Sequence, residues 1–108
     1  MRANRVRWFL LFLLVGAAFQ LPAQQSEADS KLLADVRAKA EKGDAQSQNV
    51  LGSALYLGGL GLVKDETEAV KWYRKAAEQN DAHAQCNLGD RYYRGQGVAK
   101  DEVEAVRW

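Results

Sequence analysis

Apolar residues recur three and four positions apart over several stretches of the chain, which is the spacing that gives an α-helix one buried face. Leu51 and Leu55 form such a stripe, and Leu88 and Tyr92 repeat it later. Between them, the inward positions of a further stripe are Ala69, Val70, Tyr73, Ala76 and Ala77. The pattern predicts an all-α fold without β-sheet, with helices near 30–42, 44–57, 66–79, 81–94 and 102–108.

The polar residues and glycines between these stripes repeat as well. The segment from Leu51 to Trp72 returns from Leu88 to Trp108, displaced by 37 residues before the loop glycines and by 36 after them. One loop residue near Gly59 is therefore extra in the first copy. A fixed period of this length is typical of a solenoid of stacked helical hairpins, because a single hairpin cannot bury its apolar face alone.

The repeated turn residues predict where each helix ends and begins. Gly58 and Gly95 occupy the left-handed position that closes a helix, and Asn80 takes the same role after the helix near 66–79. Asp65 and Asp101 then open the second helix of each copy. A glutamate follows each aspartate three residues later, which predicts a capping box whose glutamate reaches back to the aspartate backbone.

Two glycines and two aromatic residues predict how the hairpins pack. Gly52 and Gly89 lie in mid-helix, where glycine costs about 1 kcal/mol relative to alanine. Their recurrence indicates that the second helix of each hairpin approaches closely at that point. We also expect Trp72 and Tyr73 to be buried between successive hairpins, since aromatic side chains supply much of the energy of such interfaces.

The first residues of the chain have a different character. Arg2, Arg5 and Arg7 precede an apolar run from Trp8 to Phe19, and small residues follow at Ala17, Ala18 and Ala23. This is the layout of a secretory signal peptide, with cleavage expected after Ala23 or Ala18. The alternative is an uncleaved membrane anchor, but spanning needs about 20 apolar residues, and Gln20 and Pro22 interrupt the run.

Removal of such a signal peptide changes the charge balance. The full chain has a formal net charge of +1. The mature chain has a net charge of about −2, because the three signal arginines are lost and all 14 acidic residues remain. No basic stripe is present, so the sequence does not indicate nucleic-acid binding, and after cleavage no stable membrane span is expected.

Cys86 is the only cysteine, and His83 precedes it by one helical turn. An internal disulfide is therefore impossible, although a lone cysteine in an oxidising compartment can pair with another molecule. Two side chains do not complete a zinc site, and no base or oxyanion donor accompanies the pair. The sequence predicts no catalytic residue, no metal site and no cofactor.

The repeated residues resemble the Sel1-like repeat, a relative of the tetratricopeptide repeat. In the first copy they are Ala45, Leu51-Gly52, Leu55-Tyr56, Gly58, Gly61-Leu62, Lys64-Asp65, Ala69-Val70 and the run Trp72-Tyr73-Arg74-Lys75-Ala76-Ala77-Glu78-Gln79. In the second they are Ala82, Gln85, Leu88-Gly89, Tyr92-Tyr93, Gly95, Gly97-Val98, Lys100-Asp101, Ala105-Val106 and Trp108. The resemblance implies an α/α solenoid that acts as an adaptor for protein complexes; secreted bacterial members serve envelope assembly, signalling or host contact. The paired cysteines of the disulfide-stapled branch are absent.

These observations predict four segments. They are a signal peptide at 1–23, a linker and N-terminal capping helix at 24–42, a first repeat at 43–79 and an incomplete second repeat at 80–108. Asp35 and Lys39 stand where the first repeat has Trp72 and Ala76, which gives the capping helix the polar outer face that a solenoid end needs. Because the chain stops in mid-helix at Trp108, we expect it to be a fragment of a longer repeat protein.

The function expected from this pattern is a non-enzymatic protein-interaction scaffold, exported to the bacterial envelope or beyond. Its partners are expected to be other proteins or peptides, whose identity the sequence does not give. The alternatives are a self-associating structural component of the envelope and a secreted enzyme of unidentified type.

A binding groove is predicted on the first helix of each repeat, beside the core stripe. By helical periodicity it comprises Gln46, Asn49, Ser53, Tyr56, His83, Cys86, Asp90 and Tyr93. Polar side chains around a recurring tyrosine suit an extended peptide. The alternative is that Tyr56 and Tyr93 only complete the hairpin core.

Overall fold

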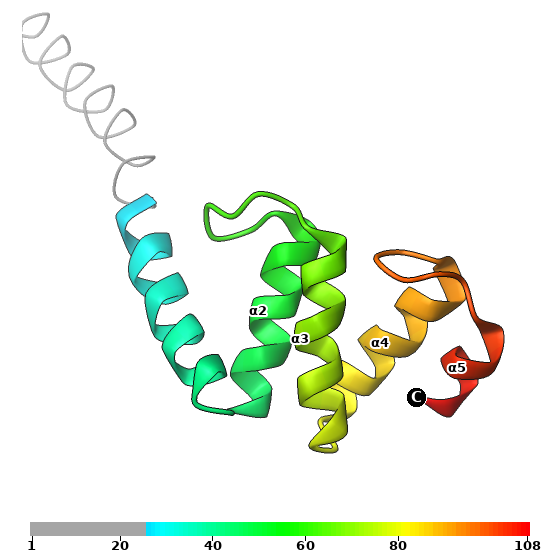
Figure 1. Ribbon diagram of the computed structural model, residues 1–108. Coiled ribbons are helices and arrows are strands. Elements are labelled where there is room, and N and C mark those ends of the chain that lie inside the picture. The colour runs from blue at the N-terminus through cyan, green and yellow to red at the C-terminus, as the bar shows by residue number, and fades with distance from the viewer. Residues whose placement is uncertain (1–25) are drawn as a thin grey trace, which may run out of the picture.

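The computed structural model describes residues 26–108, and the predicted signal peptide at 1–23 lies outside this range. Residues 26–41 are helical. Four further helices follow, α2 (Ala45–Leu57), α3 (Glu66–Glu78), α4 (Ala82–Arg94) and α5 (Glu102–Arg107). They lie in a row in chain order, with successive helices running in opposite directions (Figure 1). Residues 26–108 contain no strand, so the predicted all-α hairpin fold is confirmed.

Aspartates begin all four of these helices. The carboxylates of Asp44, Asp65, Asp81 and Asp101 each accept a hydrogen bond from a backbone N–H in the first turn that follows. These N–H groups have no partner within the helix, so a capping carboxylate stabilises the helix start.

The predicted capping box is wrong in its second half. Neither Glu68 nor Glu104 bonds back to its aspartate; the Asp65 N–H donates instead to the Leu55 carbonyl at 2.9 Å, and the Asp101 N–H to the Tyr92 carbonyl at 2.9 Å. Carbonyls in the last turn of a helix have no donor within it. The aspartate N–H supplies one, and each contact ties the end of the first helix of a hairpin to the start of the second.

Left-handed residues close the helices at the predicted places. Gly58 and Gly95 have φ of 70° and 66°, and Asn80 has φ of 66°. The first loop is one residue longer than the second, and there Leu60 has φ of 55°, a conformation rare for a side chain of this size. The extra residue predicted near Gly59 therefore lies in a tight left-handed turn.

The two mid-helix glycines let the helices of each hairpin touch. A Cβ atom at Gly52 would lie 2.8 Å from the Tyr73 ring and 3.1 Å from the Ala69 carbonyl oxygen. A Cβ atom at Gly89 would lie 3.0 Å from the Ala105 carbonyl oxygen. The close approach inferred from the repetition of these glycines is confirmed in both hairpins.

The core runs continuously along the row of helices. Its buried members are Val36, Ala40, Leu51, Leu55, Ala69, Val70, Tyr73, Ala76, Ala77, Ala84 and Leu88. Tyr73 is buried as predicted, whereas Trp72 is only half-buried at the edge of the core. Lys75 is exposed, and its Nζ atom lies 4.4 Å from the centroid of the Trp72 ring. Trp72 therefore packs against the core as expected but is less buried than Tyr73, because adjacent positions on a helix point about 100° apart.

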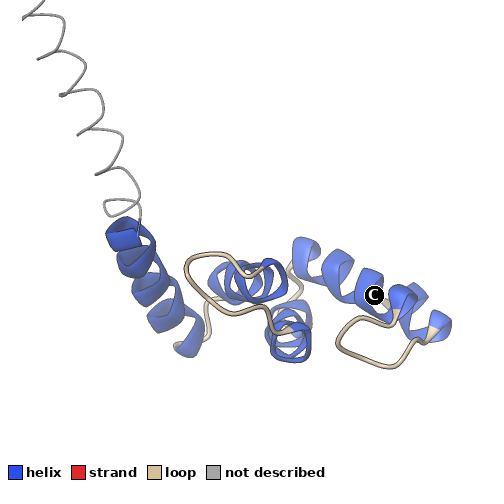
Figure 2. Ribbon diagram, turned by 90° about the horizontal axis from the view of Figure 1, so that it is seen from above, coloured by secondary structure: helices blue, strands red, loops and turns tan. Residues whose placement is uncertain are grey.

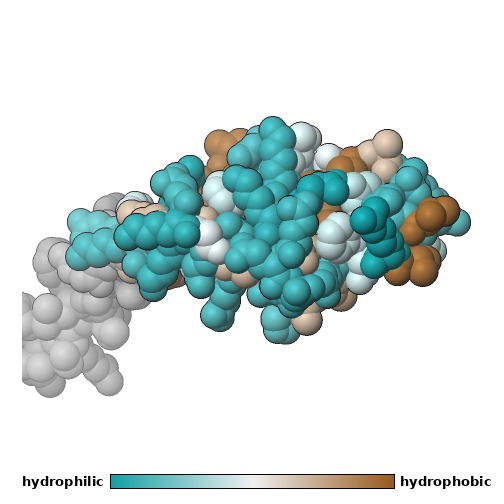
Figure 3. All heavy atoms as spheres, turned by 60° about the horizontal axis from the view of Figure 1, so that its bottom comes forward, coloured by the Kyte–Doolittle hydropathy of each residue, from teal (hydrophilic) through white to brown (hydrophobic). Residues whose placement is uncertain are grey.

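Consecutive helices contact one another, α2 with α3, α3 with α4 and α4 with α5, and the view from above shows them following each other in a row (Figure 2). No helix among residues 26–108 is long and apolar enough to cross a membrane. One face of the molecule is mostly hydrophilic, and a conspicuous group of hydrophobic side chains lies at the right-hand end in this view (Figure 3). That end contains α4 and α5.

Candidate functional site

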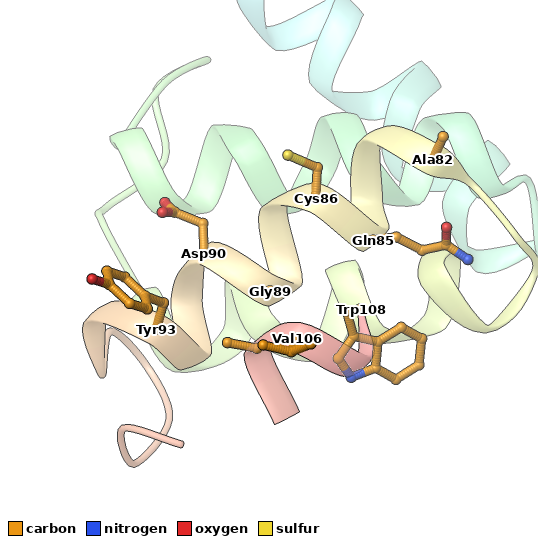
Figure 4. Close-up of a pocket in the computed structure, with 9 residues that line it drawn as sticks. Ala82, Gln85, Cys86, Gly89, Asp90, Tyr93, Val106 and Trp108 are labelled. Carbon is orange, nitrogen blue, oxygen red and sulfur yellow. The ribbon is translucent and has the colours of Figure 1, made fainter. Parts of the chain in front are cut away.

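Three of the predicted groove residues line one cavity at the C-terminal end of the row. Cys86, Asp90 and Tyr93 project from α4 at intervals of four and three residues, so they lie along one edge of the helix (Figure 4). The cavity has a volume of about 520 Å³ and is open to solvent. Tyr93 is 60% exposed.

The remaining walls of the cavity were not predicted as site residues. They are Ala82, Gln85, Gly89, Ala105, Val106 and Trp108, contributed by α4 and α5. Figure 4 shows Val106 and Trp108 on the α5 side of the cavity, facing the backbone of α4 at Gly89. The position of Gly89 opposite α5 follows from its close helix contact, which the sequence did indicate. The exposure of Val106 does not follow from the sequence, because its equivalent Val70 is buried.

The four groove residues of the first repeat have different surroundings. The Tyr56 hydroxyl donates to Gln96 Oε1 at 3.2 Å. The Arg91 guanidinium carbon lies 3.8 Å from the centroid of the Tyr56 ring, within the range of a cation–π interaction. Both partners of Tyr56 belong to the second repeat. Tyr56 is therefore part of the contact between the repeats, while Tyr93 is exposed.

Two further first-repeat positions are also engaged by neighbouring helices. Asn49 Oδ1 accepts from Asn87 Nδ2 at 3.0 Å, and Ser53 Oγ accepts from the Tyr73 hydroxyl at 3.1 Å. Gln46 on α2 and His83 on α4 are exposed, and neither lines the cavity. The structure thus brings together Cys86, Asp90 and Tyr93, but not all eight predicted residues.

Asp90 orders the charged groups beside the cavity. It accepts from Arg94 Nε at 2.9 Å and also pairs with Arg91. Burial alone would raise the pKa of Asp90, but the hydrogen bonds from Arg94 and Arg91 outweigh it and hold that pKa below its usual value. Asp90 therefore stays ionised at neutral pH and fixes the Arg91 guanidinium over Tyr56.

A pair of glutamines marks the contact between successive hairpins. Gln48 Nε2 donates to the Ala40 carbonyl at 3.1 Å, and its counterpart Gln85 donates to the Ala77 carbonyl at 3.3 Å. Gln48 Oε1 additionally accepts from Gln79 Nε2 at 2.8 Å. The sequence carried a signal for this network, since Gln48 and Gln85 are identical and 37 residues apart.

A second cavity, of about 430 Å³, lies on the outer side of α3. Trp72 forms part of it, together with Lys71, Lys75 and the loop residues Gly97 and Val98. Trp72 therefore lies beside the loop of the second repeat, which contributes to its partial burial.

The chemistry of the end cavity is that of a binding surface. Cys86 is an exposed free thiol. Within residues 26–108, no three side chains of His, Cys, Asp and Glu come together to form a candidate metal site. The cavity combines apolar surface from Val106 and Trp108 with a tyrosine hydroxyl and an amide, the mixture that recurs in protein-recognition sites.

A family model for the Sel1 repeat matches residues 45–81 and 82–108. The chain belongs to the Sel1 repeat family. Sel1 repeats generally mediate protein–protein interactions, and members are typically non-catalytic scaffolds.

Two solved Sel1-type proteins resemble this chain. One is c5321, a protective antigen present in uropathogenic Escherichia coli strains and displaying an SLR fold, with 38% identity over 73% of this chain and a TM-score of 0.70. The other is a Sel1 repeat protein from Oxalobacter formigenes, with 37% identity over 68% of this chain and a TM-score of 0.65. The match covers 17% of the first protein and 21% of the second, so this Sel1 chain spans about a fifth of their length. No protein of curated function matches the chain at a significant level.

Proposed function

We propose that this Sel1 chain is a non-catalytic adaptor, exported to the cell envelope or beyond, that binds partner proteins through the cavity between α4 and α5. The observation that carries the proposal is the exposed Tyr93 ring beside Cys86 and Asp90 on the wall of that cavity. Tyrosine supplies a large, rigid contact area with a polar tip, and it is enriched among the residues that dominate binding energies.

Export is supported by the sequence of residues 1–23. Three arginines, a run of twelve apolar residues and a small residue before the expected cleavage point match a secretory signal peptide. Replacing Arg2, Arg5 and Arg7 by glutamate is expected to leave the protein uncleaved inside the cell. N-terminal sequencing of the exported fraction checks this, and exported protein that still begins at Met1 would favour a membrane anchor instead.

Cys86 offers a direct test of the binding site, because the only thiol of the chain lies on the wall of the cavity. A photo-activated cross-linker attached to Cys86 should capture the bound partner in extracts of the producing cell. The Tyr93→Ala variant should lose the captured bands while it remains folded.

The matched control moves the cross-linker away from the cavity. The double variant Cys86→Ser, Lys31→Cys places the thiol on the exposed side of the helix at residues 26–41. It should yield none of the bands seen from Cys86. Identical bands from both positions, or bands that persist in Tyr93→Ala, would show that the partner binds elsewhere. A band at twice the mass of the chain that depends on its own concentration would indicate self-association instead.

A further inference from the structure

The cavity of about 430 Å³ on the outer side of α3 combines apolar surface with positive charge, and we call it the α3 groove. Helix α3 supplies one wall with Trp72, Arg74 and Lys75, and the loop after α4 supplies the other with Gly97 and Val98. Helix α5 lines the cavity beside α4 but contributes nothing to this groove, and the two cavities share no residue. The α3 groove is therefore a separate surface.

The loop wall of the α3 groove is held tightly against the helix. A Cβ atom at Gly97 would lie 2.3 Å from the Glu66 carbonyl oxygen, so only a residue without a side chain permits this approach. Val98 follows directly and packs, half-buried, against the core. Because both walls are already in place in the fold, a ligand that enters the groove has little of the protein to order.

Two cations of the groove are positioned by aromatic rings. Lys75 Nζ lies 4.4 Å from the centroid of the Trp72 ring. The Arg74 guanidinium carbon lies 5.5 Å from the centroid of the Tyr92 ring, and Arg74 also donates to the Tyr92 hydroxyl. Within residues 26–108, neither cation pairs with a carboxylate. An aromatic ring attracts a cation without neutralising it, so both positive charges stay available to an anion.

The carboxylates of the groove do not compensate these charges. Glu68 pairs with Lys71 at 3.7 Å. Glu78 also lines the groove, but in the described part of the chain it makes no ion pair and is exposed to solvent. The charged side chains of the lining are three cations and two carboxylates, so the groove has a net positive charge.

We propose that the α3 groove binds an acidic segment of a partner protein, with carboxylates on Arg74 and Lys75 and an apolar side chain against Trp72 and Val98. After its bond to Tyr92, the Arg74 guanidinium keeps further N–H donors, and a carboxylate is the acceptor that fits this planar fork. The half-buried indole and Val98 favour burial of an apolar neighbour.

The position of Lys75 favours a protein partner over a carbohydrate. A sugar ring would stack on a free face of the indole, but the Lys75 ammonium already lies over the Trp72 ring. A carboxylate can instead pair with that ammonium from the solvent side. The proposal goes beyond the adaptor function assigned to the cavity between α4 and α5, because it gives the chain a second and independent binding surface.

A short synthetic peptide, in which pairs of glutamates alternate with single leucines, supplies the probe. Fluorescence anisotropy of the labelled peptide measures its binding to the full chain. The double variant Trp8→Phe, Trp108→Phe leaves Trp72 as the only tryptophan. A shift of its emission to shorter wavelength on addition of the unlabelled peptide reports that water has been displaced from the groove.

The glutamate peptide should bind, shift the Trp72 emission and bind more weakly as salt is added. The Lys75→Gln protein should bind it about fivefold more weakly, the loss expected for one solvent-accessible ion pair. Lys31→Gln is the matched control, since it removes the same charge from the exposed side of the helix at residues 26–41 and should leave binding unchanged. Glu78→Gln should tighten binding, because it removes a carboxylate that repels the peptide.

Two altered peptides test the two halves of the proposal. Glutamine in place of every glutamate should weaken binding about tenfold, and serine in place of every leucine should weaken it to a similar extent. Equal binding of either altered peptide would overturn the proposal, because charge or apolar contact would then contribute nothing.

Three further results would also overturn it. Equal losses in Lys75→Gln and Lys31→Gln would show only a general attraction between the chain and anions. An unchanged Trp72 emission would place the peptide elsewhere. Displacement of the peptide by polygalacturonate at a lower concentration of carboxylate would assign the groove to an acidic polysaccharide. The cross-linking from Cys86 would still test the cavity between α4 and α5, because the two surfaces share no residue.

Discussion

Tyr56 and Tyr93 have the same place in two copies of one repeat but different surroundings. Tyr56 bonds to Gln96 and lies beneath Arg91, so it connects the hairpins. Tyr93 extends beside the end cavity, with most of its surface exposed. Removal of each ring therefore tests a different property.

Tyr56→Ala is expected to lower the free energy of unfolding by about 2 kcal/mol, because it removes a hydrogen bond and leaves the buried Arg91 guanidinium without its ring. Tyr93→Ala should change it by less than about 0.5 kcal/mol, as is usual for an exposed position. Urea unfolding followed by far-ultraviolet circular dichroism measures both. Equal losses in the two variants would contradict the different environments described above.

Asp44 makes stability depend on acid pH. The Ser47 hydroxyl and backbone N–H both donate to its carboxylate and hold the pKa of Asp44 below its usual value. A carboxylate with a lowered pKa in the folded state stabilises the fold above its unfolded pKa, and this contribution is lost as the pH falls through the folded value. The stabilisation by Asp44 is therefore lost below about pH 4.

Asp44→Asn keeps an N-cap acceptor but removes this titration. The variant should therefore lose less stability than the unaltered protein between pH 5 and the acid limit of folding. Urea midpoints measured at several pH values test the expectation. If the urea midpoints of the two proteins fall in parallel as the pH is lowered, Asp44 makes no contribution to the acid dependence of stability.

At the scale of the helices, each hairpin depends on a glycine in the first helix and on contacts between helix ends. Gly52 allows α3 to approach α2, and the Asp65 N–H joins the start of α3 to the carbonyl of Leu55. Glycine in mid-helix is unfavourable by itself. The close contact with the Tyr73 ring compensates for this cost.

Gly52→Ala is therefore expected to destabilise the fold by about 2 kcal/mol although alanine favours helix, because the new methyl group meets Tyr73 at 2.8 Å. Gly59→Ala is the matched control. Its new Cβ atom would have no neighbour closer than 3.9 Å, so stability should be nearly unchanged. Thermal unfolding of both variants tests the difference, and a more stable Gly52→Ala would mean that the helices are farther apart than described.

At the scale of the whole molecule, the helices of the row differ in how much of their surface neighbouring helices bury. Helix α3 contributes five buried residues and contacts helices on both sides, whereas α5 contributes none. In a solenoid each unit is stabilised mainly by its direct neighbours. The α5 end should therefore open more readily than the middle.

Hydrogen exchange should reveal this order. Backbone amides of α5 are expected to exchange fastest among the four capped helices, and those of α2 and α3 slowest, since local opening costs least where few apolar contacts are broken. Mass spectrometry of the exchanging protein measures the order. Equal protection along the row would contradict a chain stabilised by neighbour contacts.

The sequence by itself determined the helices, their ends and the repeat, because these features depend on short-range chemistry. An aspartate accepts from N–H groups within one turn, and Gly58 or Asn80 adopts a left-handed conformation whatever lies nearby. Even the close helix contact at Gly52 could be inferred from the sequence. Glycine is unfavourable in a helix, so its recurrence at the same position of both copies needs a structural reason. The spacing along α4 likewise placed Cys86, Asp90 and Tyr93 on one edge.

Only the tertiary structure decided which of two equivalent residues is covered. Tyr56 and Tyr93 both precede a helix-closing glycine by two residues, and Val70 and Val106 lie in nearly identical segments. These local patterns do not predict which member of each pair is covered. Their exposure depends on whether another hairpin lies against them, and those contacts join residues about 27 to 40 positions apart. The half-burial of Trp72 has the same origin, because the loop that covers its ring comes from the following repeat. Burial in a solenoid is a property of neighbouring units, which the residues of one unit do not specify.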